Sequence, residues 1–224
     1  MVHKIINNKY RIFVETLILT IVIYLLGFSF GFFIENYRTN NIIENYKNDV
    51  INEADLRLQN YYYEIMSKED CNFSIQENFI FADRIYNTGL RLEQYEEANQ
   101  LTGDLLLEKK QYILLKTELW FNTILLKNKC GNPFDTVVYV YSNRPVNQAL
   151  ISEQKIISNV LKNLKEEKGN QIVLIPIAGD LDLDIVNLQL KRYNVTSLPS
   201  IIINEKDVLE GFHSEEEISG YLRS

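Results

Sequence analysis

The feature that most constrains this chain is a run of nineteen residues without a charge, from Thr16 to Ile34. A helix of that length spans about 29 Å, close to the thickness of the hydrocarbon core of a bilayer. A buried core helix seldom needs so many consecutive apolar residues. A cleaved signal peptide has a shorter apolar stretch, followed by small residues at a cleavage site. We therefore predict an uncleaved transmembrane helix over residues 12–35, with the lipid bilayer as its partner and a tail of residues 1–11 before it.

The charges on either side of this run predict its orientation. Lys4, Lys9 and Arg11 precede the run, whereas Glu35 and Arg38 nearly cancel behind it. Positive side chains concentrate on the cytoplasmic side of a membrane helix. The sequence therefore predicts a single-pass signal anchor in the cell membrane, with a cytoplasmic N-terminus and an extracytoplasmic C-terminal part.

Within the predicted span, Gly27 and Gly31 form a small-xxx-small pair. Such a pair lets a second helix approach closely, which makes a homodimer one candidate assembly. Glycines are also common in membrane helices for other reasons, so this alternative stays open. Glu15 lies near the cytoplasmic end, where its carboxylate can reach the headgroups.

Helical patterns fill the region 36–131. Apolar residues recur every three or four positions over Ile43–Ile65, which predicts a coiled-coil-like stalk that continues from the span. A second pattern runs from Cys71 toward Leu92, and a third covers Leu105–Lys129 after the break at Thr102–Asp104. In the third helix we expect these residues in the core rather than in a ligand site: Tyr112, Ile113, Leu119, Trp120 and Ile124.

The two cysteines of the chain occupy the outer ends of these helices. Cys71 begins the second pattern and Cys130 ends the third, so an antiparallel hairpin would place them side by side. A disulfide requires Cα atoms within about 7 Å, and an oxidising compartment favours it. Two buried free thiols are the alternative. A catalytic pair is disfavoured, because the C-terminal end of a helix does not stabilise a thiolate.

The C-terminal part alternates short apolar runs with amphipathic stretches. Runs rich in β-branched residues indicate strands, and stretches with helical spacing separate them. A capping box, Ser214 with Glu217, begins a last short helix that continues to Leu222. The predicted order is βαβαββα, with strands at 137–141, 172–175, 201–203 and 208–212 and with longer helices through 150–164 and 183–193.

The segment Tyr193–Ile203, with Pro199 directly before Ser200 and an apolar triplet, resembles the loop of the thioredoxin superfamily in which a cis proline opens the third strand. The resemblance implies an α/β thioredoxin-like domain over residues 134–224. It also implies a peptide-contact surface formed by Leu198 and Pro199 together with Ser142 and Arg144. Catalytic members have Cys-x-x-Cys after the first strand. Here Ser142 and Pro145 stand in those places and no cysteine follows Cys130, so we expect a redox-inactive domain.

Composition excludes several functions. A net charge of −7 and a pI near 5.0 argue against nucleic acid as a partner. His3 and His213 are far apart in the sequence, and no motif at metal-ligand spacing, phosphate-binding loop or hydrolase motif is present. We therefore expect no metal and no cofactor, and an enzyme is disfavoured.

These features favour a membrane-anchored protein that presents a non-catalytic thioredoxin-like domain for protein or peptide binding, or as a scaffold. Two alternatives stay open. The chain could be an extracytoplasmic thiol–disulfide oxidoreductase that uses Cys71 and Cys130, or a structural subunit of a membrane assembly.

Overall fold

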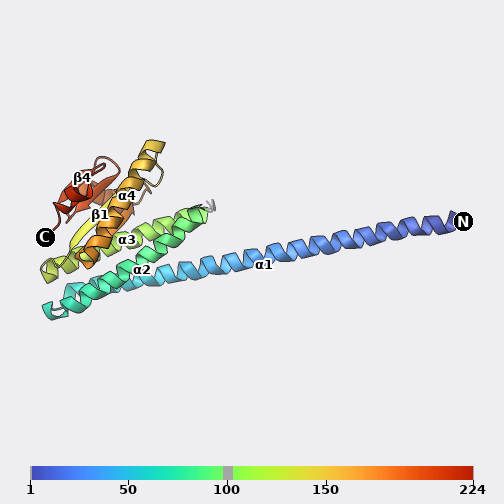
Figure 1. Cartoon of the computed structure of the whole chain (residues 1–224). Helices are drawn as coiled ribbons and strands as arrows, with labels where there is room; N and C mark the ends of the chain where they lie inside the picture. Colours follow the sequence, from blue (N-terminus) through green and yellow to red (C-terminus); the bar gives the residue numbers. More distant parts are fainter. Residues whose placement is uncertain (1, 98–102, 224) are drawn as a thin grey trace. The chain divides into compact units, whose positions relative to one another are not determined.

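The chain is a mixed α/β protein with an apolar N-terminal helix and a four-stranded mixed sheet (Figure 1). This computed structural model describes residues 2–97 and 103–223, and describes side chains at 10–34, 50–51, 53–90, 92 and 106–223. The chain divides into two compact units, one that ends at Asn48 and one that begins at Asp49. The longer elements are α1 (Val2–Ile65), α2 (Cys71–Glu97), α3 (Gly103–Cys130), β1 (Asp135–Tyr141), α4 (Gln148–Lys168), β2 (Ile172–Ala178), α5 (Asp184–Arg192), β3 (Ser200–Ile203), β4 (Asp207–Glu210) and α6 (Glu215–Ser219).

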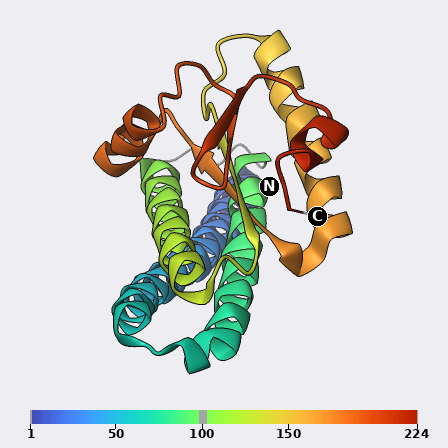
Figure 2. The same cartoon turned by 90° about the vertical axis from the view of Figure 1, so that its left-hand side faces the viewer.

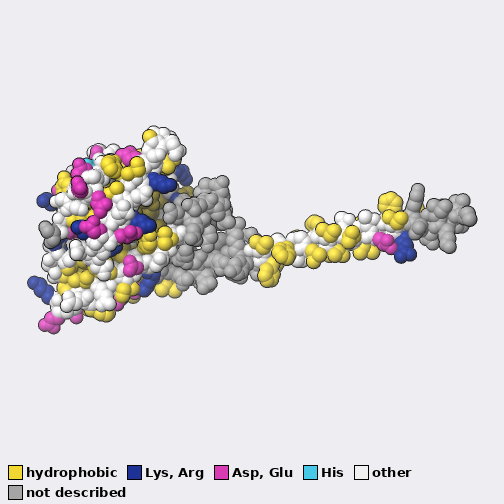
Figure 3. All heavy atoms as spheres, viewed as in Figure 1, with side chains coloured by type: hydrophobic (Ala, Val, Ile, Leu, Met, Phe, Trp, Pro, Cys, Tyr) yellow, Lys and Arg dark blue, Asp and Glu magenta, His cyan; other side chains and the backbone are white. Residues whose placement is uncertain are grey.

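The N-terminal unit contains the apolar stretch that was expected from the sequence. The stretch Tyr10–Ile34 of α1 has 25 residues, and an 18-residue window within it has a mean hydropathy of 2.5. None of the 25 residues is buried within the chain. Hydrophobic side chains cover this stretch in Figure 3. It is long and apolar enough to cross a membrane, in agreement with the prediction of a span at 12–35. Its orientation in a membrane stays a prediction. The side chains on which that prediction rests, Lys4, Lys9, Glu35 and Arg38, lie outside the described residues.

Several polar groups near the start of the apolar stretch have local partners. Arg11 Nε donates to Glu15 Oε1 at 2.8 Å, and Thr20 Oγ1 donates to the carbonyl of Thr16 at 2.8 Å. Such pairing satisfies polar atoms that lipid cannot. A Cβ added to Gly27 or Gly31 would meet nothing within 4 Å, so both positions of the predicted helix contact are open.

In the second unit, α2 and α3 form the expected hairpin, and the predicted disulfide joins its ends. Helix α2 begins at Cys71 and α3 ends at Cys130, and their bonded cysteines have Cα atoms 5.7 Å apart. The two helices lie side by side in Figures 1 and 2. Of the expected break at Thr102–Asp104, Thr102 lies outside the described residues, whereas Gly103 and Asp104 already form the start of α3, two residues earlier than predicted.

The end of α1 packs against this hairpin. Leu56 and Tyr63 point inward and are almost fully buried, and Asn122 Nδ2 donates to the carbonyl of Leu56 at 3.0 Å. Of the residues expected in the core of α3, Ile113, Leu119 and Trp120 are buried, whereas Tyr112 and Ile124 are partly buried.

The sheet has the strand order β2-β1-β3-β4. Strand β1 pairs with β2 in parallel and with β3 in antiparallel orientation, and β3 and β4 are antiparallel. All four predicted strands form. Strand β4 ends before the predicted Phe212, because Gly211 takes a φ of +74°, which glycine adopts without a steric penalty.

Helices cover both faces of the sheet, as Figure 2 shows. Successive residues of β1 point to opposite faces. Val137 and Tyr139 join the core under α4 and α6, whereas Val138 and Val140 join a core that includes α5 and the α2–α3 hairpin. The hairpin therefore forms part of the layer over one face of the sheet, and Asp49–Ser224 is a single unit.

Candidate binding groove beside the β1–α4 loop

The loop between β1 and α4 occupies the place where the resemblance puts a catalytic motif. Strand β1 ends at Tyr141, and the N-cap of α4 is Asn147, whose side chain accepts a hydrogen bond from the Leu150 amide at 2.9 Å. Asn147, and not Ser142, therefore caps this helix. Pro145 disfavours helical angles in the residue before it, and Asn147 is a good N-cap, so the helix begins later.

The side chain of Asp180 holds this loop from the other side. Its carboxylate accepts from Ser142 Oγ at 2.6 Å and from the amides of Asn143 and Arg144 at 2.6 and 3.2 Å. Burial acts to raise the pKa of Asp180, but these hydrogen bonds outweigh it, so the net pKa is lowered. The Asp180 carboxylate therefore stays ionised at neutral pH. It holds the hydroxyl of Ser142, the residue that the resemblance puts in the place of the nucleophile.

Sequence reasoning missed Asp180 because no motif surrounds it. Its position could have been inferred from topology. Strands β1 and β2 are parallel, so the loops after their carboxyl ends lie at the same edge of the sheet. The pairing of Tyr141 with Ala178 accordingly places Ser142 close to Asp180.

Two further side chains fix the same loop. Gln154 of α4 donates to the carbonyl of Ser142 at 3.1 Å and accepts from its amide at 2.7 Å. Lys109 of α3 donates to Asn143 Oδ1 at 2.6 Å. The backbone of Ser142 is thus paired within the chain, so its two polar groups are engaged before any ligand arrives.

The predicted proline loop lies at the start of β3. The Leu198–Pro199 peptide is cis, and the Pro199 carbonyl accepts from the Gly211 amide at 2.9 Å. Glu210 Oε1 accepts from the amide and hydroxyl of Thr196, at 2.9 and 2.6 Å, which lowers the pKa of Glu210. Pro199 is buried and Leu198 is partly buried.

The two loops meet at one edge of the sheet. Val140 pairs with Ser200, so the end of β1 and the start of β3 are neighbours. Leu198 packs close to Gly179, where an added Cβ would lie 2.9 Å from Val140 Cγ1 and 3.0 Å from Leu198 Cδ1. A side chain at position 179 would therefore push the proline loop away from the sheet.

A groove of about 710 Å³ opens between this edge, the hairpin and α4. Its walls are rich in aromatic residues, and lysines stand among them. Of the four predicted contact residues, Ser142 lines the groove, whereas Arg144, Leu198 and Pro199 are not among its lining residues. The aromatic and basic lining residues are Tyr86, Tyr112, Tyr139, Tyr141, Lys109, Lys116 and Lys155.

The groove residues are held in place by contacts with one another. The rings of Tyr139 and Tyr141 stack with centroids 5.7 Å apart, and Lys116 Nζ lies 4.1 Å from the centroid of the Tyr112 ring. Burial raises the pKa of Tyr139 to about 12, so its hydroxyl stays neutral. Among the described lining residues, the charged side chains are the lysines.

The disulfide is remote from the groove. Cys71 precedes Tyr86 by fifteen residues of the same helix, about 22 Å along its axis. Within the described part of the chain no group of three or more His, Cys, Asp or Glu side chains could hold a metal ion.

Comparisons with known proteins give little further information. No protein-family model matches the chain, and no curated protein matches it. A solved structure titled "Structure of a malarial protein" is similar, with 20% identity and a TM-score of 0.32. The match covers 39% of this chain and 92% of the other. A likeness of this size bears on neither fold family nor function.

Proposed function

We propose that the chain is a membrane-anchored binding protein in which a thioredoxin-like fold without thiol chemistry supports a peptide groove outside the cytoplasm. The order βαβαββα and the sheet order β2-β1-β3-β4 support the thioredoxin-like assignment, together with the proline loop at the start of β3. The apolar stretch Tyr10–Ile34 supports the anchor.

The absence of thiol chemistry rests on the β1–α4 loop. Position 142 is a serine whose hydroxyl donates to Asp180, and α4 begins six residues later at Gln148. A nucleophile at this position would face a carboxylate rather than the positive end of a helix, and such a charge disfavours a thiolate or alkoxide. We therefore assign binding, and not catalysis, to the groove beside this loop.

The observation that carries the proposal is the groove of about 710 Å³ beside this loop. Clefts of this size, with apolar walls and a few polar groups, are typical binding sites. Tyrosines supply contact area at a small entropic cost, and the lysines complement negative charge. The occupant that fits is an extended peptide segment with aromatic and acidic side chains.

The proposal predicts charge-dependent peptide binding that depends on the groove. We would measure fluorescence anisotropy of a labelled decapeptide of alternating Tyr and Glu with the full chain in detergent. A decapeptide of alternating Tyr and Lys serves as the probe of opposite charge. We expect saturable binding of the acidic peptide and weaker binding of the basic one.

A matched pair of variants separates the groove from the general surface. Lys155 lines the groove, whereas Lys162, seven residues along the same helix, is exposed and pairs with Glu166. We expect Lys155→Glu to weaken acidic-peptide binding about tenfold, which corresponds to about 1.4 kcal/mol, and Lys162→Glu to leave it nearly unchanged. Equal effects of the two substitutions, or no saturable binding by the wild-type chain, would contradict the proposal.

A further inference from the structure

The last turns of α1 carry a second surface, which the groove does not use. Five apolar residues, Ile51, Ala54, Leu58, Tyr61 and Ile65, follow one another at spacings of three, four, three and four. We name this set the α1 stripe. An alternation of three and four is the pattern of a coiled-coil seam, in which the a and d positions face a partner helix.

The α1 stripe is exposed. Relative exposure is 64% for Ile51, 67% for Leu58, 66% for Tyr61 and 82% for Ile65. A contiguous exposed apolar surface of this kind marks an interaction site more often than a free surface. No charged residue interrupts the stripe.

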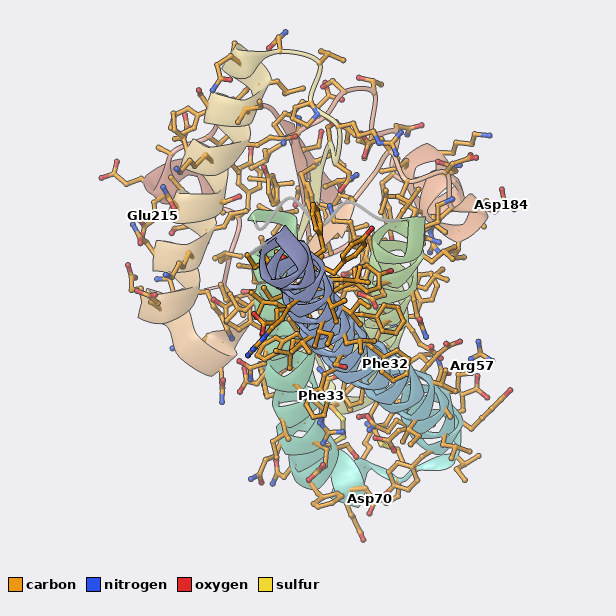
Figure 4. All side chains as sticks on the ribbon, turned by 90° about the vertical axis from the view of Figure 1, so that its right-hand side faces the viewer. Phe32, Phe33, Arg57, Asp70, Asp184 and Glu215 are labelled. Atoms are coloured by element: carbon orange, nitrogen blue, oxygen red, sulfur yellow. A yellow bond between two sulfur atoms is a disulfide. The ribbon has the colours of Figure 1, made fainter. Side chains whose placement is uncertain are left out.

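Among the described residues none covers the stripe, and the opposite side of α1 packs against the hairpin. Leu56 and Tyr63 are buried against the hairpin. Arg57 pairs with Glu53 of the same helix, and its Nε lies 3.8 Å from Oε1 of Glu118 in α3. Arg57 projects from this part of α1 in Figure 4. This part of α1 therefore has one face packed on its own hairpin and one face that no described residue covers.

We propose that the α1 stripe pairs with the same stripe of a second copy in a parallel, two-stranded coiled coil. Heptad spacing requires a helix with the same repeat, and a second copy supplies one. The parallel orientation rests on the membrane anchor proposed above, since two chains inserted in one membrane run in the same direction. Confinement to that membrane also raises the effective concentration of one copy for the other.

Cysteine cross-linking in membranes tests this pairing directly. In a parallel coiled coil, the same a position of both helices faces the axis, so Leu58→Cys should form an intermolecular disulfide with mild oxidant. The control is Glu64→Cys, which is exposed on the same helix but lies off the stripe. We expect at least about tenfold more adduct of twice the 26.3 kDa chain mass from Leu58→Cys than from Glu64→Cys.

A second pair of substitutions tests whether the apolar stripe drives the contact. Adding Ile51→Glu and Ile65→Glu to the Leu58→Cys chain places charges at two further seam positions. We expect the adduct to fall about tenfold or more, because a charge at a desolvated contact is costly. Both positions are exposed in the single chain, so its own fold should tolerate the charges.

Different results would contradict the pairing of the stripes, the choice of a second copy as the partner, and the membrane anchor. Equal adduct from Leu58→Cys and Glu64→Cys, or adduct insensitive to the two glutamates, overturns the pairing. An adduct of another mass overturns the choice of a second copy. Sedimentation of the chain with membranes is measured on the same samples. A chain that does not sediment with membranes refutes the anchor and the parallel orientation. The adduct of Leu58→Cys still shows in that case whether two α1 stripes pair.

Discussion

Buried Lys127 of α3 and partly buried Glu205 of the β3–β4 turn form an ion pair, with Nζ and Oε2 2.9 Å apart. Lys127 also donates to Thr136 Oγ1 at 2.6 Å and to Asn204 Oδ1 at 2.8 Å. Glu205 accepts from Trp120 Nε1 at 3.0 Å. These contacts fasten the hairpin to the far end of the sheet. They explain why the hairpin and the sheet belong to one unit.

The first prediction concerns this pair. Lys127→Met should lower the free energy of unfolding by about 3 kcal/mol, because it leaves Glu205 partly buried without its cation. Lys129→Met is the control, since Lys129 is exposed and donates to the Glu64 carbonyl. The control should cost less than about 1 kcal/mol. Denaturant unfolding of the full chain in detergent measures the free energy of unfolding of both variants. If Lys127→Met lowered it no more than Lys129→Met does, the ion pair would add nothing to stability beyond an exposed contact.

The second prediction concerns the disulfide. Cys71→Ser and Cys130→Ser should destabilise the chain equally, by up to about 4 kcal/mol in the chain-entropy description. The double variant should cost no more than either single variant, because one bridge is lost in each case. Additive losses would indicate two independent contributions.

The third prediction tests the oxidoreductase alternative. A structural bridge between Cys71 and Cys130 should resist mild reductant, so maleimide labelling before and after treatment should give the same count. Ready labelling after mild reduction, together with turnover of a protein disulfide, would favour the enzyme over the binding protein.

The fourth prediction concerns pH. Asp180 has a lowered pKa in the folded chain, so its contribution is present above the ordinary Asp pKa of about 3.9 and is lost as pH falls through its folded value. Asp180→Asn should cost about 1–2 kcal/mol at neutral pH through weaker loop hydrogen bonds. The substitution should also weaken the fall of the free energy of unfolding with decreasing pH on the acid side. An unchanged pH dependence there would show that Asp180 does not contribute to it.

The fifth prediction concerns a thiol introduced into the β1–α4 loop. In Ser142→Cys, the thiol would stand beside the Asp180 carboxylate and outside the first turn of α4. We expect its pKa to be at or above that of free Cys, and to fall when Asp180→Ala is added. The pH dependence of iodoacetamide labelling measures it. A lowered thiol pKa in Ser142→Cys would contradict the argument that Asp180 disfavours a thiolate at position 142.

Membrane topology gives a test of the compartment. A protease added to intact cells should remove the domain from Phe134 to Ser224, as the positive-inside rule predicts. Protection in intact cells with digestion after lysis would reverse the orientation. It would also remove the argument from compartment for the disulfide.

Local pattern was sufficient for much of the fold. The apolar stretch, the helix that begins at Cys71, the helix that ends at Cys130 and all four strands follow from periodicity and from breakers within a few residues. The capping box of Ser214 and Glu217 forms as predicted, because its hydrogen bonds join residues three apart. Hydrophobic spacing and caps act over short distances along the chain, so the amino-acid order alone specifies them.

The candidate site depended on tertiary structure. Asp180 reaches Ser142 across 38 residues, Lys109 reaches Asn143 across 34, and Lys127 reaches Glu205 across 78. Each contact forms only after the sheet has paired and the hairpin has packed on it, and no local pattern encodes that arrangement. The role of Ser142 was decided in the same way: the parallel pairing of β1 and β2 brings Asp180 next to it, and the Ser142 hydroxyl donates to that carboxylate.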